Sequence, residues 1–196
     1  MKVEKVKETD GKIEFKLSNS NPAFANAIRR TAIAGVLTYA VDKVIFYENT
    51  SSLFDEYIAH RIGLVPLKTD YTLPPATEIS LSIDKEGPAM VYSGDMKSSD
   101  RKISPASKKI PIMKIGPGQV LRVEAKARLG AGREHAKWQP GLCTYSCLKG
   151  KEGIDESTFM FKVETYGGLP PATIVLKAAE ALQERCGAFL KELKSL

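Results

Sequence analysis

Cysteine and histidine, the side chains that most often bind metal ions, are few and widely spaced in this chain. Cys143 and Cys147 are separated by three residues, whereas Cys186 lies much nearer the end of the sequence. Structural zinc sites use four ligands in closely spaced pairs, and the two histidines, His60 and His135, belong to other segments. We therefore expect no metal site and interpret Cys186 as a small core residue.

Two other patterns that could bind phosphate or activate a nucleophile are incomplete. Gly130 and Gly132 follow a predicted strand, but the third glycine of the dinucleotide-binding pattern G-x-G-x-x-G would fall at His135. The G-x-S-x-G sequence of serine hydrolases does not occur. No clustered aspartate motif could hold Mg²⁺ for nucleotidyl transfer. The sequence therefore predicts no catalytic residues.

The most unusual polar feature is the adjacent pair Arg29 and Arg30, which lies in the largely apolar run NAIRRTAIAGVL. A buried cation without a partner is strongly destabilising, so each guanidinium must contact solvent, a carboxylate or a carbonyl. Successive helical residues point about 100° apart, which lets the two arginines serve different contacts. Arginine suits interface ion pairs, and the alternative is a pair of solvated side chains.

These arginines fall in the second turn of a helix expected from about residue 22 to 39, with Pro22 in its first turn. Apolar residues occur on several sides of this helix, so one sheet cannot cover them all. Each large apolar side chain left exposed forfeits about 1.5–3 kcal/mol, against a domain stability of about 5–15 kcal/mol. We infer that another polypeptide covers the outer side. The alternative is a helix enclosed by its own chain.

The rest of the sequence predicts strands and two further helices. Alternation of apolar and charged residues is clearest in QVLRVEAKARLG. An apolar stripe predicts a short helix within residues 51–67, and near-heptad spacing predicts a long helix over 171–194. Residues 86–109, rich in Ser, Lys, Asp and Gly, are expected to form a loop of low order. The expected strands are 12–17, 44–49, 79–84, 119–130 and 158–165.

This order of elements predicts an α+β fold with two domains. The two long helices lie near opposite ends of the chain, each next to a strand. We therefore expect a discontinuous outer domain of residues 1–42 and 157–196, with a β-rich domain of residues 43–156 inserted into it.

The composition is that of a basic protein with a sizeable core. Of 196 residues, 43% are hydrophobic, and Lys and Arg outnumber Asp and Glu by 29 to 23. This balance permits nucleic-acid binding, but most basic residues have acidic neighbours, as in LRVEAKAR, which is typical of a mixed solvated surface. The few cysteines, the absence of a long apolar run and the charged start of the sequence lead us to expect a cytoplasmic protein.

Three separate segments resemble one known family. NAIRR followed by TAIAGVLTYAVDKV, then NTSSLFDEYIAHRIGLVPL, then GREHAKWQPG resemble the D subunits of archaeal RNA polymerases, in the order in which that family has them. The family is the counterpart of the third-largest subunit of eukaryotic polymerase II and of the N-terminal part of bacterial alpha. The resemblance implies a dimerisation domain, built from both chain ends, that pairs with the polymerase's L subunit. It also implies a platform for the large catalytic subunits and the small N subunit.

The resemblance further implies which residues contact partners. The segment around residues 26–30 would meet the second-largest subunit, and residues 55–67 and 133–138 would be further docking elements. The residues implied in large-subunit docking are Asn26, Arg29, Arg30, His60, Arg61, Glu134, His135, Lys137 and Trp138. Those implied in pairing with the L subunit are Phe24, Ile28, Ile33, Val36, Leu37, Val175, Leu182, Cys186, Phe189 and Leu193.

The sequence departs from some members of the family in one place. Many relatives carry a cysteine-rich insertion after GLVPL that binds zinc or an iron–sulfur cluster, whereas PLKTDYTLPPATEISLSID here has no cysteine. We therefore expect no cofactor. The sequence ends on the long helix, so we expect DNA contact only through the complex. The resulting hypothesis is a non-catalytic assembly subunit of RNA polymerase, and the alternative is a free-standing basic nucleic-acid-binding domain.

Overall fold

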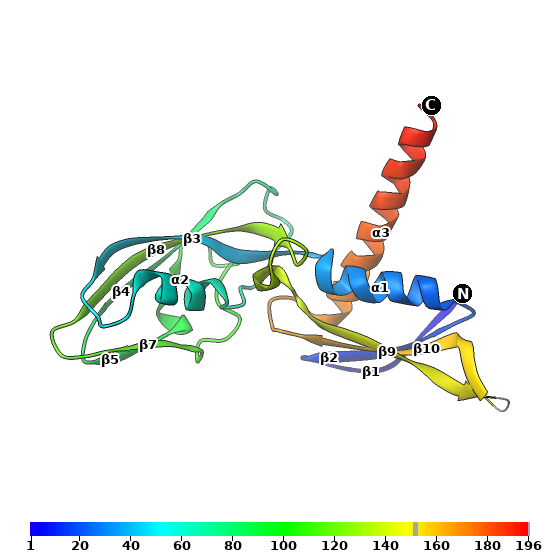
Figure 1. Ribbon diagram of the computed structural model, residues 1–196, viewed down its shortest axis with the longest axis horizontal. Coiled ribbons are helices and arrows are strands. Elements are labelled where there is room, and N and C mark those ends of the chain that lie inside the picture. Colours follow the sequence, from blue (N-terminus) through cyan, green and yellow to red (C-terminus); the bar gives the residue numbers. More distant parts are fainter. Residues whose placement is uncertain (151–152, 196) are drawn as a thin grey trace. The chain divides into compact units, whose positions relative to one another are not determined.

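The computed structural model describes residues 1–150 and 153–195, and it has the α+β fold expected from the sequence (Figure 1). Its contacts divide the chain into two compact units. Unit 1 comprises residues 1–36, 131–133 and 139–196, and unit 2 comprises residues 37–130 and 134–138. In the described part of the chain, no helix combines the length and the apolar character that a membrane crossing requires.

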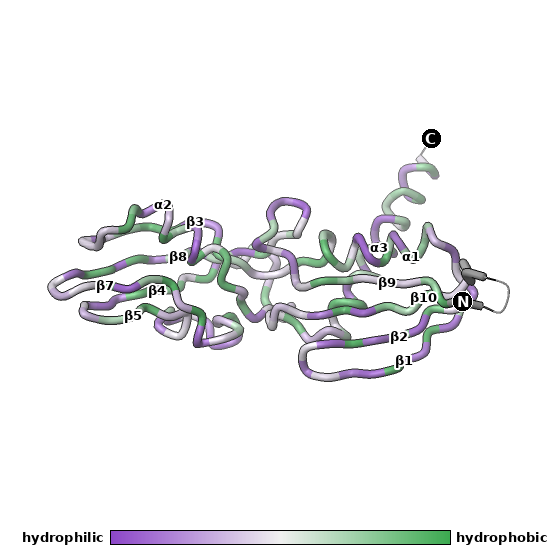
Figure 2. Tube along the Cα trace, turned by 60° about the horizontal axis from the view of Figure 1, so that its bottom comes forward, coloured by the Kyte–Doolittle hydropathy of each residue, from purple (hydrophilic) through white to green (hydrophobic). Residues whose placement is uncertain are grey.

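Unit 1 is built on a four-stranded antiparallel sheet. Its order is β1-β2-β10-β9, with bounds Lys2–Thr9, Lys12–Ser18, Gly153–Thr165 and Gly141–Gly150. The apolar face of β2 is buried, and the rings of Phe15 and Phe161 stack across the sheet with centroids 4.8 Å apart. Every side chain of β1 is exposed, and this edge strand is largely hydrophilic (Figure 2). The core of unit 1 therefore lies over the inner strands.

Two helices cover this core. Helix α1 (Pro22–Ala34) contacts β9 and β10, and it packs against α3 (Pro171–Leu193), which also contacts β10 and β2. The start of α1 is set locally, because the Asn21 side chain accepts a hydrogen bond of 2.9 Å from the Phe24 amide and Pro22 occupies the first turn. Ala25, Thr31 and Ala32 are the buried residues of α1. Small side chains thus allow α1 to lie close to its neighbours.

The expected end of α1 near residue 39 is wrong. The helix ends at Ala34, and strand β3 (Leu37–Asn49) begins three residues later. Gly35 follows the helix as its C-cap, and the run LTYAV after Val36 is rich in residues that favour strands. The pairing of β3 with β8 uses backbone groups that a continued helix would have bonded internally.

The long helix α3 is packed along only part of its length. Ile174 and Ala178 are buried, whereas every side chain from residue 183 to residue 195 is exposed. In Figure 1 this C-terminal part of α3 projects away from the sheet of unit 1.

Unit 2 contains a second antiparallel sheet and a smaller two-stranded one. The larger sheet has the order β3-β8-β4-β6, where β8 is Val120–Ala131, β4 is Ile79–Glu86 and β6 is Lys97–Ser98. The smaller pairs β5 (Ala89–Tyr92) with β7 (Pro111–Ile115). Helix α2 (Asp55–Gly63) contacts β3 and β7 and inserts Ile58 and Ile62 into the core between these elements. Leu121, Val123, Ala125 and Ala127 of β8 are buried, as the alternation predicted.

Two other sequence expectations differ from the structure. Residues 86–109 are not a loop of low order, because they contain β5, β6 and a short 3-10 helix at Ser93–Asp95, and Val91, Met96 and Ile103 are buried. These widely spaced apolar residues anchor the segment. The expected inserted domain of residues 43–156 included β9, whereas β9 pairs with β10 in the sheet of unit 1.

Candidate docking surfaces

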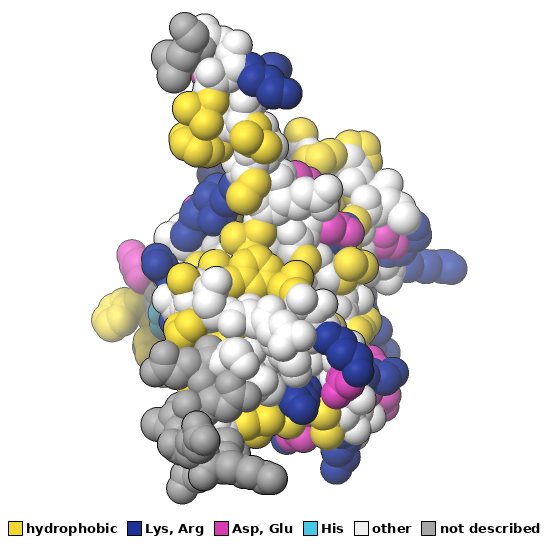
Figure 3. Space-filling model, turned by 90° about the vertical axis from the view of Figure 1, so that its right-hand side faces the viewer, with side chains coloured by type: hydrophobic (Ala, Val, Ile, Leu, Met, Phe, Trp, Pro, Cys, Tyr) yellow, Lys and Arg dark blue, Asp and Glu magenta, His cyan; other side chains and the backbone are white. Residues whose placement is uncertain are grey.

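The end of α3 presents the clearest apolar surface in unit 1. The exposed fractions of Phe189, Leu190 and Leu193 are 65%, 56% and 47%. Figure 3 shows hydrophobic side chains gathered along this projecting helix and at its base. Leu176, nearer the start of α3, and Phe24 on α1 are also exposed. We call the exposed residues Phe24, Leu176, Phe189, Leu190 and Leu193 the apolar surface of unit 1.

The residues that the resemblance implied in pairing with the L subunit differ in accessibility. Ile28, Ile33, Val175 and Leu182 are half-buried, and Phe24, Phe189 and Leu193 are exposed. Cys186 is exposed, so its interpretation as a core residue is wrong for this chain. Val36 is buried within the chain, and Leu37 is an exposed residue of β3 in unit 2 rather than part of α1. The sequence analysis missed Leu176 and Leu190, which a wider apolar stripe on α3 would have indicated.

The two adjacent arginines of α1 have different surroundings, as their helical positions predicted. Arg29 is half-buried, and its Nη2 donates a hydrogen bond of 2.8 Å to Oδ1 of Asn26. Arg30 is exposed and lines a groove of about 360 Å³ at the C-terminal end of α1. The structure therefore keeps Asn26 and Arg29 as a bonded pair and leaves Arg30 accessible.

Helix α2 presents a second candidate surface, in unit 2. Its inner face is buried, but Phe54, Tyr57 and Leu64 are exposed, Phe54 by 80%. His60 is exposed on the same helix. Arg61 is partly structural, because its Nη2 donates to the Pro111 carbonyl at 2.8 Å and its guanidinium lies 5.8 Å from the centre of the Tyr57 ring. Residues spaced three or four apart form this outer stripe, which is a sequence signal for a second apolar face.

The loop after β8 lies beside α2. A pocket of about 150 Å³ is lined by His60, Leu64, His135, Lys137 and Asp42, together with Val41, Val44, Ala59 and Gly63. Candidate docking residues that are far apart in the sequence, on α2 and in the loop, thus share one small concave surface. The resemblance implied both segments as docking elements but not their proximity, which the tertiary fold provides.

Trp138 is not an exposed docking residue, because only 2% of it is exposed. The Arg128 guanidinium lies 4.4 Å from the centre of its ring, and the Lys137 ammonium lies 4.3 Å from it. Its Nε1 donates to the Arg128 carbonyl at 3.2 Å, and a Cβ on Gly130 would lie 2.5 Å from a ring carbon. Trp138 therefore anchors the loop that carries Glu134, His135 and Lys137; Glu134 and His135 are exposed, whereas the Lys137 side chain is only 15% exposed.

Asp42 completes this anchor, which we call the tryptophan clamp (Asp42, Arg128, Gly130, Lys137 and Trp138). Its carboxylate accepts hydrogen bonds of 2.9 Å from Lys137 Nζ and from Arg128 Nε. Burial raises the pKa of Asp42, but the hydrogen bonds and charges of Lys137 and Arg128 outweigh it and lower the pKa below its ordinary value. Sequence reasoning missed Asp42 and Arg128, because nothing local links them to the loop.

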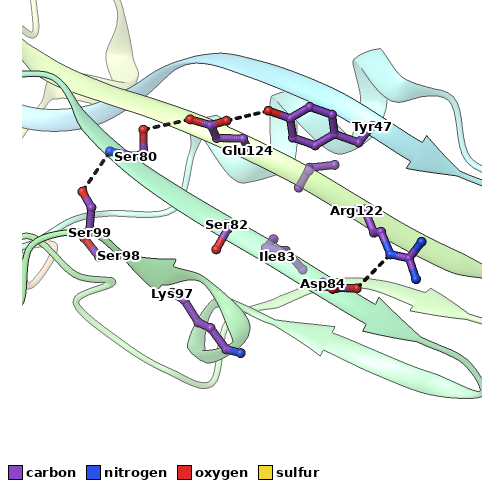
Figure 4. Close-up of a pocket in the computed structure, with 11 residues that line it drawn as sticks. Tyr47, Ser80, Ser82, Ile83, Asp84, Lys97, Ser98, Ser99, Arg122 and Glu124 are labelled. Atoms are coloured by element: carbon purple, nitrogen blue, oxygen red, sulfur yellow. Dashed lines mark hydrogen bonds and ion pairs between the residues drawn. The ribbon is translucent and has the colours of Figure 1, made fainter.

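A polar pocket of about 560 Å³ lies on the larger sheet of unit 2 (Figure 4). Glu124 accepts hydrogen bonds from the Tyr47 hydroxyl at 2.7 Å and the Ser80 hydroxyl at 2.9 Å, which lowers the pKa of its carboxyl. Arg122 pairs with Asp84 and with two glutamates, Glu48 and Glu86. No histidine or cysteine lines this pocket.

The thiols do not form a metal-binding group. Cys143 is buried, and burial raises the pKa of its thiol to about 11, while Cys147 and Cys186 are exposed. Within residues 1–150 and 153–195, no three His, Cys, Asp or Glu side chains are grouped so that they could hold a metal ion.

Comparison with known proteins identifies relatives along the whole chain. Residues 44–142 match the family model described as RNA polymerase Rpb3/RpoA insert domain. The chain is 36% identical to DNA-directed RNA polymerase subunit Rpo3 of Pyrococcus horikoshii, over 100% of this chain and 99% of the relative. It is 37% identical to the Thermococcus kodakarensis Rpo3, over 94% of each chain, and 40% identical to that of Methanocaldococcus jannaschii, over 93% and 92%. The alignment with the Pyrococcus horikoshii protein extends over 262 positions, so that relative contains segments without a counterpart in this chain.

Proposed function

We propose a function from the premise that this chain belongs to the family of archaeal DNA-directed RNA polymerase subunits named Rpo3. The chain is a non-catalytic assembly subunit of RNA polymerase that acts in transcription in the cytoplasm. It pairs with the L subunit and presents docking surfaces to the second-largest subunit and to the small N subunit. It carries no cofactor, and it meets DNA only through the complex.

The observation that carries this proposal is the apolar surface of unit 1. The part of α3 from residue 183 onward has no buried side chain, yet it contains Phe189, Leu190 and Leu193. Most helical stability in proteins comes from packing of an apolar face, and this segment of α3 gains no such packing from unit 1. Burying each of the three large side chains stabilises a complex by up to about 1.5–3 kcal/mol. A partner helix that covers this stripe satisfies both needs, and the L subunit is the partner that the family resemblance implies.

Docking of the large subunits is supported by different residues. Arg30 is accessible at the end of α1, and the pocket between α2 and the loop combines His60 and His135 with exposed apolar neighbours. Such a mixture of charged, aromatic and apolar side chains is typical of protein interfaces. The tryptophan clamp holds the loop after β8 in place within unit 2. The side chains that this loop carries are therefore positioned by the fold.

The alternative, a free-standing nucleic-acid-binding domain, has less support. Several lysines of the unit 1 sheet pair with glutamates, as in Lys2 with Glu4, Lys12 with Glu14 and Lys162 with Glu164. Nucleic-acid binding requires basic side chains that neutralise phosphates, and its affinity falls steeply with salt. An interface with an apolar centre responds little to salt, so salt dependence separates the two functions.

Pairing is tested by changing the apolar surface. We expect the chain expressed alone to self-associate and the chain co-expressed with the L subunit to form a 1:1 complex in size-exclusion chromatography. The triple variant Phe189→Ser, Leu190→Ser, Leu193→Ser should lose the complex while unit 1 keeps its fold, because none of the three side chains is buried. A matched control changes three exposed polar residues of the same helix, Gln183, Glu184 and Lys191, to serine. A triple apolar variant that still forms the 1:1 complex contradicts the proposal.

Large-subunit docking is tested with the purified heterodimer. The double variant Arg29→Ala, Arg30→Ala should leave pairing with the L subunit intact and weaken capture of the second-largest subunit. Arg29→Ala alone separates the two roles, because it removes the hydrogen bond to Asn26 but leaves the accessible Arg30. Unchanged capture by the double variant shows that α1 has no docking role.

A further inference from the structure

The groove at the C-terminal end of α1 brings together three arginines from distant parts of the sequence. Arg30 lies on α1, Arg133 follows β8, and Arg185 lies on α3. All three belong to unit 1, and all three are exposed. The groove of about 360 Å³ is completed by Ala27, Thr31, Ala34, Gly35 and Leu182, so no acidic side chain lines it.

The backbone around the groove fixes where these arginines lie. The Arg133 amide donates a hydrogen bond of 3.1 Å to the Ala34 carbonyl, so the backbone at Arg133 is tied to the end of α1 within unit 1. A Cβ on Gly132 would lie 2.5 Å from the Ile33 carbonyl oxygen, which shows how closely the two backbones approach. A Cβ on Gly35 would lie 3.4 Å from Nη2 of Arg185. The guanidinium of Arg185 therefore reaches the C-terminal end of α1.

The three arginines differ from most others in the chain, because no acceptor contacts their side chains among the described residues. Arg122 and Arg128 pair with carboxylates, Arg29 bonds to Asn26, and Arg61 bonds to a backbone carbonyl. In the described residues, no carboxylate lies within ion-pair distance of Arg30, Arg133 or Arg185, and none of their side chains donates a hydrogen bond. Each guanidinium carries five N–H donors that suit a carboxylate.

The partial negative charge at the C-terminal end of α1 balances only part of the positive charge of the three arginines. A helix C-terminus carries the equivalent of about half an elementary charge, which favours a nearby cation such as Arg185. Three guanidinium groups exceed that charge several-fold. The groove is therefore a site of uncompensated positive potential rather than a capped helix end.

We propose that Arg30, Arg133 and Arg185 form one carboxylate-binding site for an acidic segment of the second-largest polymerase subunit. This inference rests on the proposed function, because it names the chemistry by which the α1 region docks that subunit. It adds Arg133 and Arg185 as binding residues and makes the three arginines a single site. A planar guanidinium can hold a carboxylate by two parallel hydrogen bonds, and three of them would select an acidic side chain over a neutral one.

The surroundings favour a polypeptide over a nucleic acid. The groove has an apolar side, formed by Ala27, Ala34 and Leu182, and its volume admits one or two side chains. A phosphate backbone would need a continuous basic track, whereas several lysines on the unit 1 sheet, among them Lys2, Lys12 and Lys162, are paired with glutamates. The acidic segment would therefore bury its carboxylates among the arginines and its aliphatic stems against the alanines.

The test uses the heterodimer of this chain with the L subunit and measures its Kd for the purified second-largest subunit. We expect the double variant Arg133→Gln, Arg185→Gln to weaken binding about tenfold or more, with a larger loss at low salt than at high salt. Arg185→Lys should lose less than Arg185→Gln, because it keeps the charge but not the two-pronged geometry. The matched control is Arg101→Gln, an exposed arginine outside the groove that also has no ion pair in the described chain, and it should leave Kd unchanged.

The outcomes separate this inference from the proposed function. If the unaltered heterodimer does not bind the second-largest subunit, the proposed function fails. If it binds and the double variant binds equally well, the function stands and the arginine site is refuted. Loss of affinity for a short DNA duplex, with no change for the second-largest subunit, identifies a nucleic-acid site and also overturns the inference. Should the double variant not pair with the L subunit, the single variant Arg185→Gln decides, since Arg185 is exposed and its loss leaves the core intact.

Discussion

Asp42 is the residue whose replacement should most clearly weaken unit 2 without removing a buried apolar group. Its carboxylate accepts from Lys137 and Arg128 at 2.9 Å, and its side chain is 27% exposed. Asp42→Asn keeps one oxygen acceptor but removes the anion that Lys137 and Arg128 share, while Arg128 keeps its ion pair with Glu134 at 3.3 Å. Hydrogen bonds to charged groups contribute about 1.5–3 kcal/mol each, and exposed ion pairs about 0.2–1 kcal/mol. Because Arg128 is 37% exposed, we expect a loss of about 1–3 kcal/mol.

The assay is denaturant unfolding followed by the fluorescence of Trp138, the only tryptophan in the chain and a member of the clamp. This signal reports on unit 2 even if unit 1 unfolds separately. A loss of about 1 kcal/mol corresponds to a fall in Tm of about 2–4 °C for a protein of this size. The matched control is Asp10→Asn, which lies in an exposed turn and has no ion pair among the described residues.

The dependence on pH distinguishes a lost charge from a general defect. The pKa of Asp42 is lowered in the folded state, so its carboxylate contributes stability that is fully present above the unfolded pKa of about 3.9. That stability is lost as the pH falls through the lower folded pKa. The difference between the variant and the unaltered chain should therefore be full near neutral pH and shrink below about pH 4. Equal stability near neutral pH, or a difference that persists unchanged in acid, would refute the reasoning.

Two further predictions concern buried contacts. Gly130→Ala places a Cβ 2.5 Å from a ring carbon of Trp138. We therefore expect a destabilisation of about 1–3 kcal/mol and a red-shifted Trp138 fluorescence emission. Native-like emission with unchanged stability would contradict this contact. Brief treatment with iodoacetamide at about pH 8 should modify Cys147 and Cys186 before Cys143, because the Cys143 thiol is buried and its pKa is raised to about 11. Mass spectrometry of the native chain measures the order of labelling. Equal labelling of the three thiols would show that Cys143 is accessible.

Local sequence signals were sufficient wherever near neighbours decide the structure. The alternation in β8 correctly predicted its buried face, and Pro22 predicted the start of α1. The expected helix over 171–194 corresponds to α3 at Pro171–Leu193. The expected end of α1 failed because strand pairing between residues far apart in the sequence overrode the helical pattern. Family membership was also recognisable, since three motifs occur in a fixed order.

The sequence by itself determined the class of fold, the main helices and strands, and the segments that carry candidate docking residues. Only the tertiary structure decided which of these side chains are accessible. It bonded Arg128 and Lys137, which lie beside the buried Trp138 ring, to the distant Asp42, and it joined Arg30, Arg133 and Arg185 around one groove. The physical reason is that burial and charge compensation depend on contacts between residues about fifty to a hundred positions apart, and periodicity and spacing report only on neighbours within a few turns or one strand.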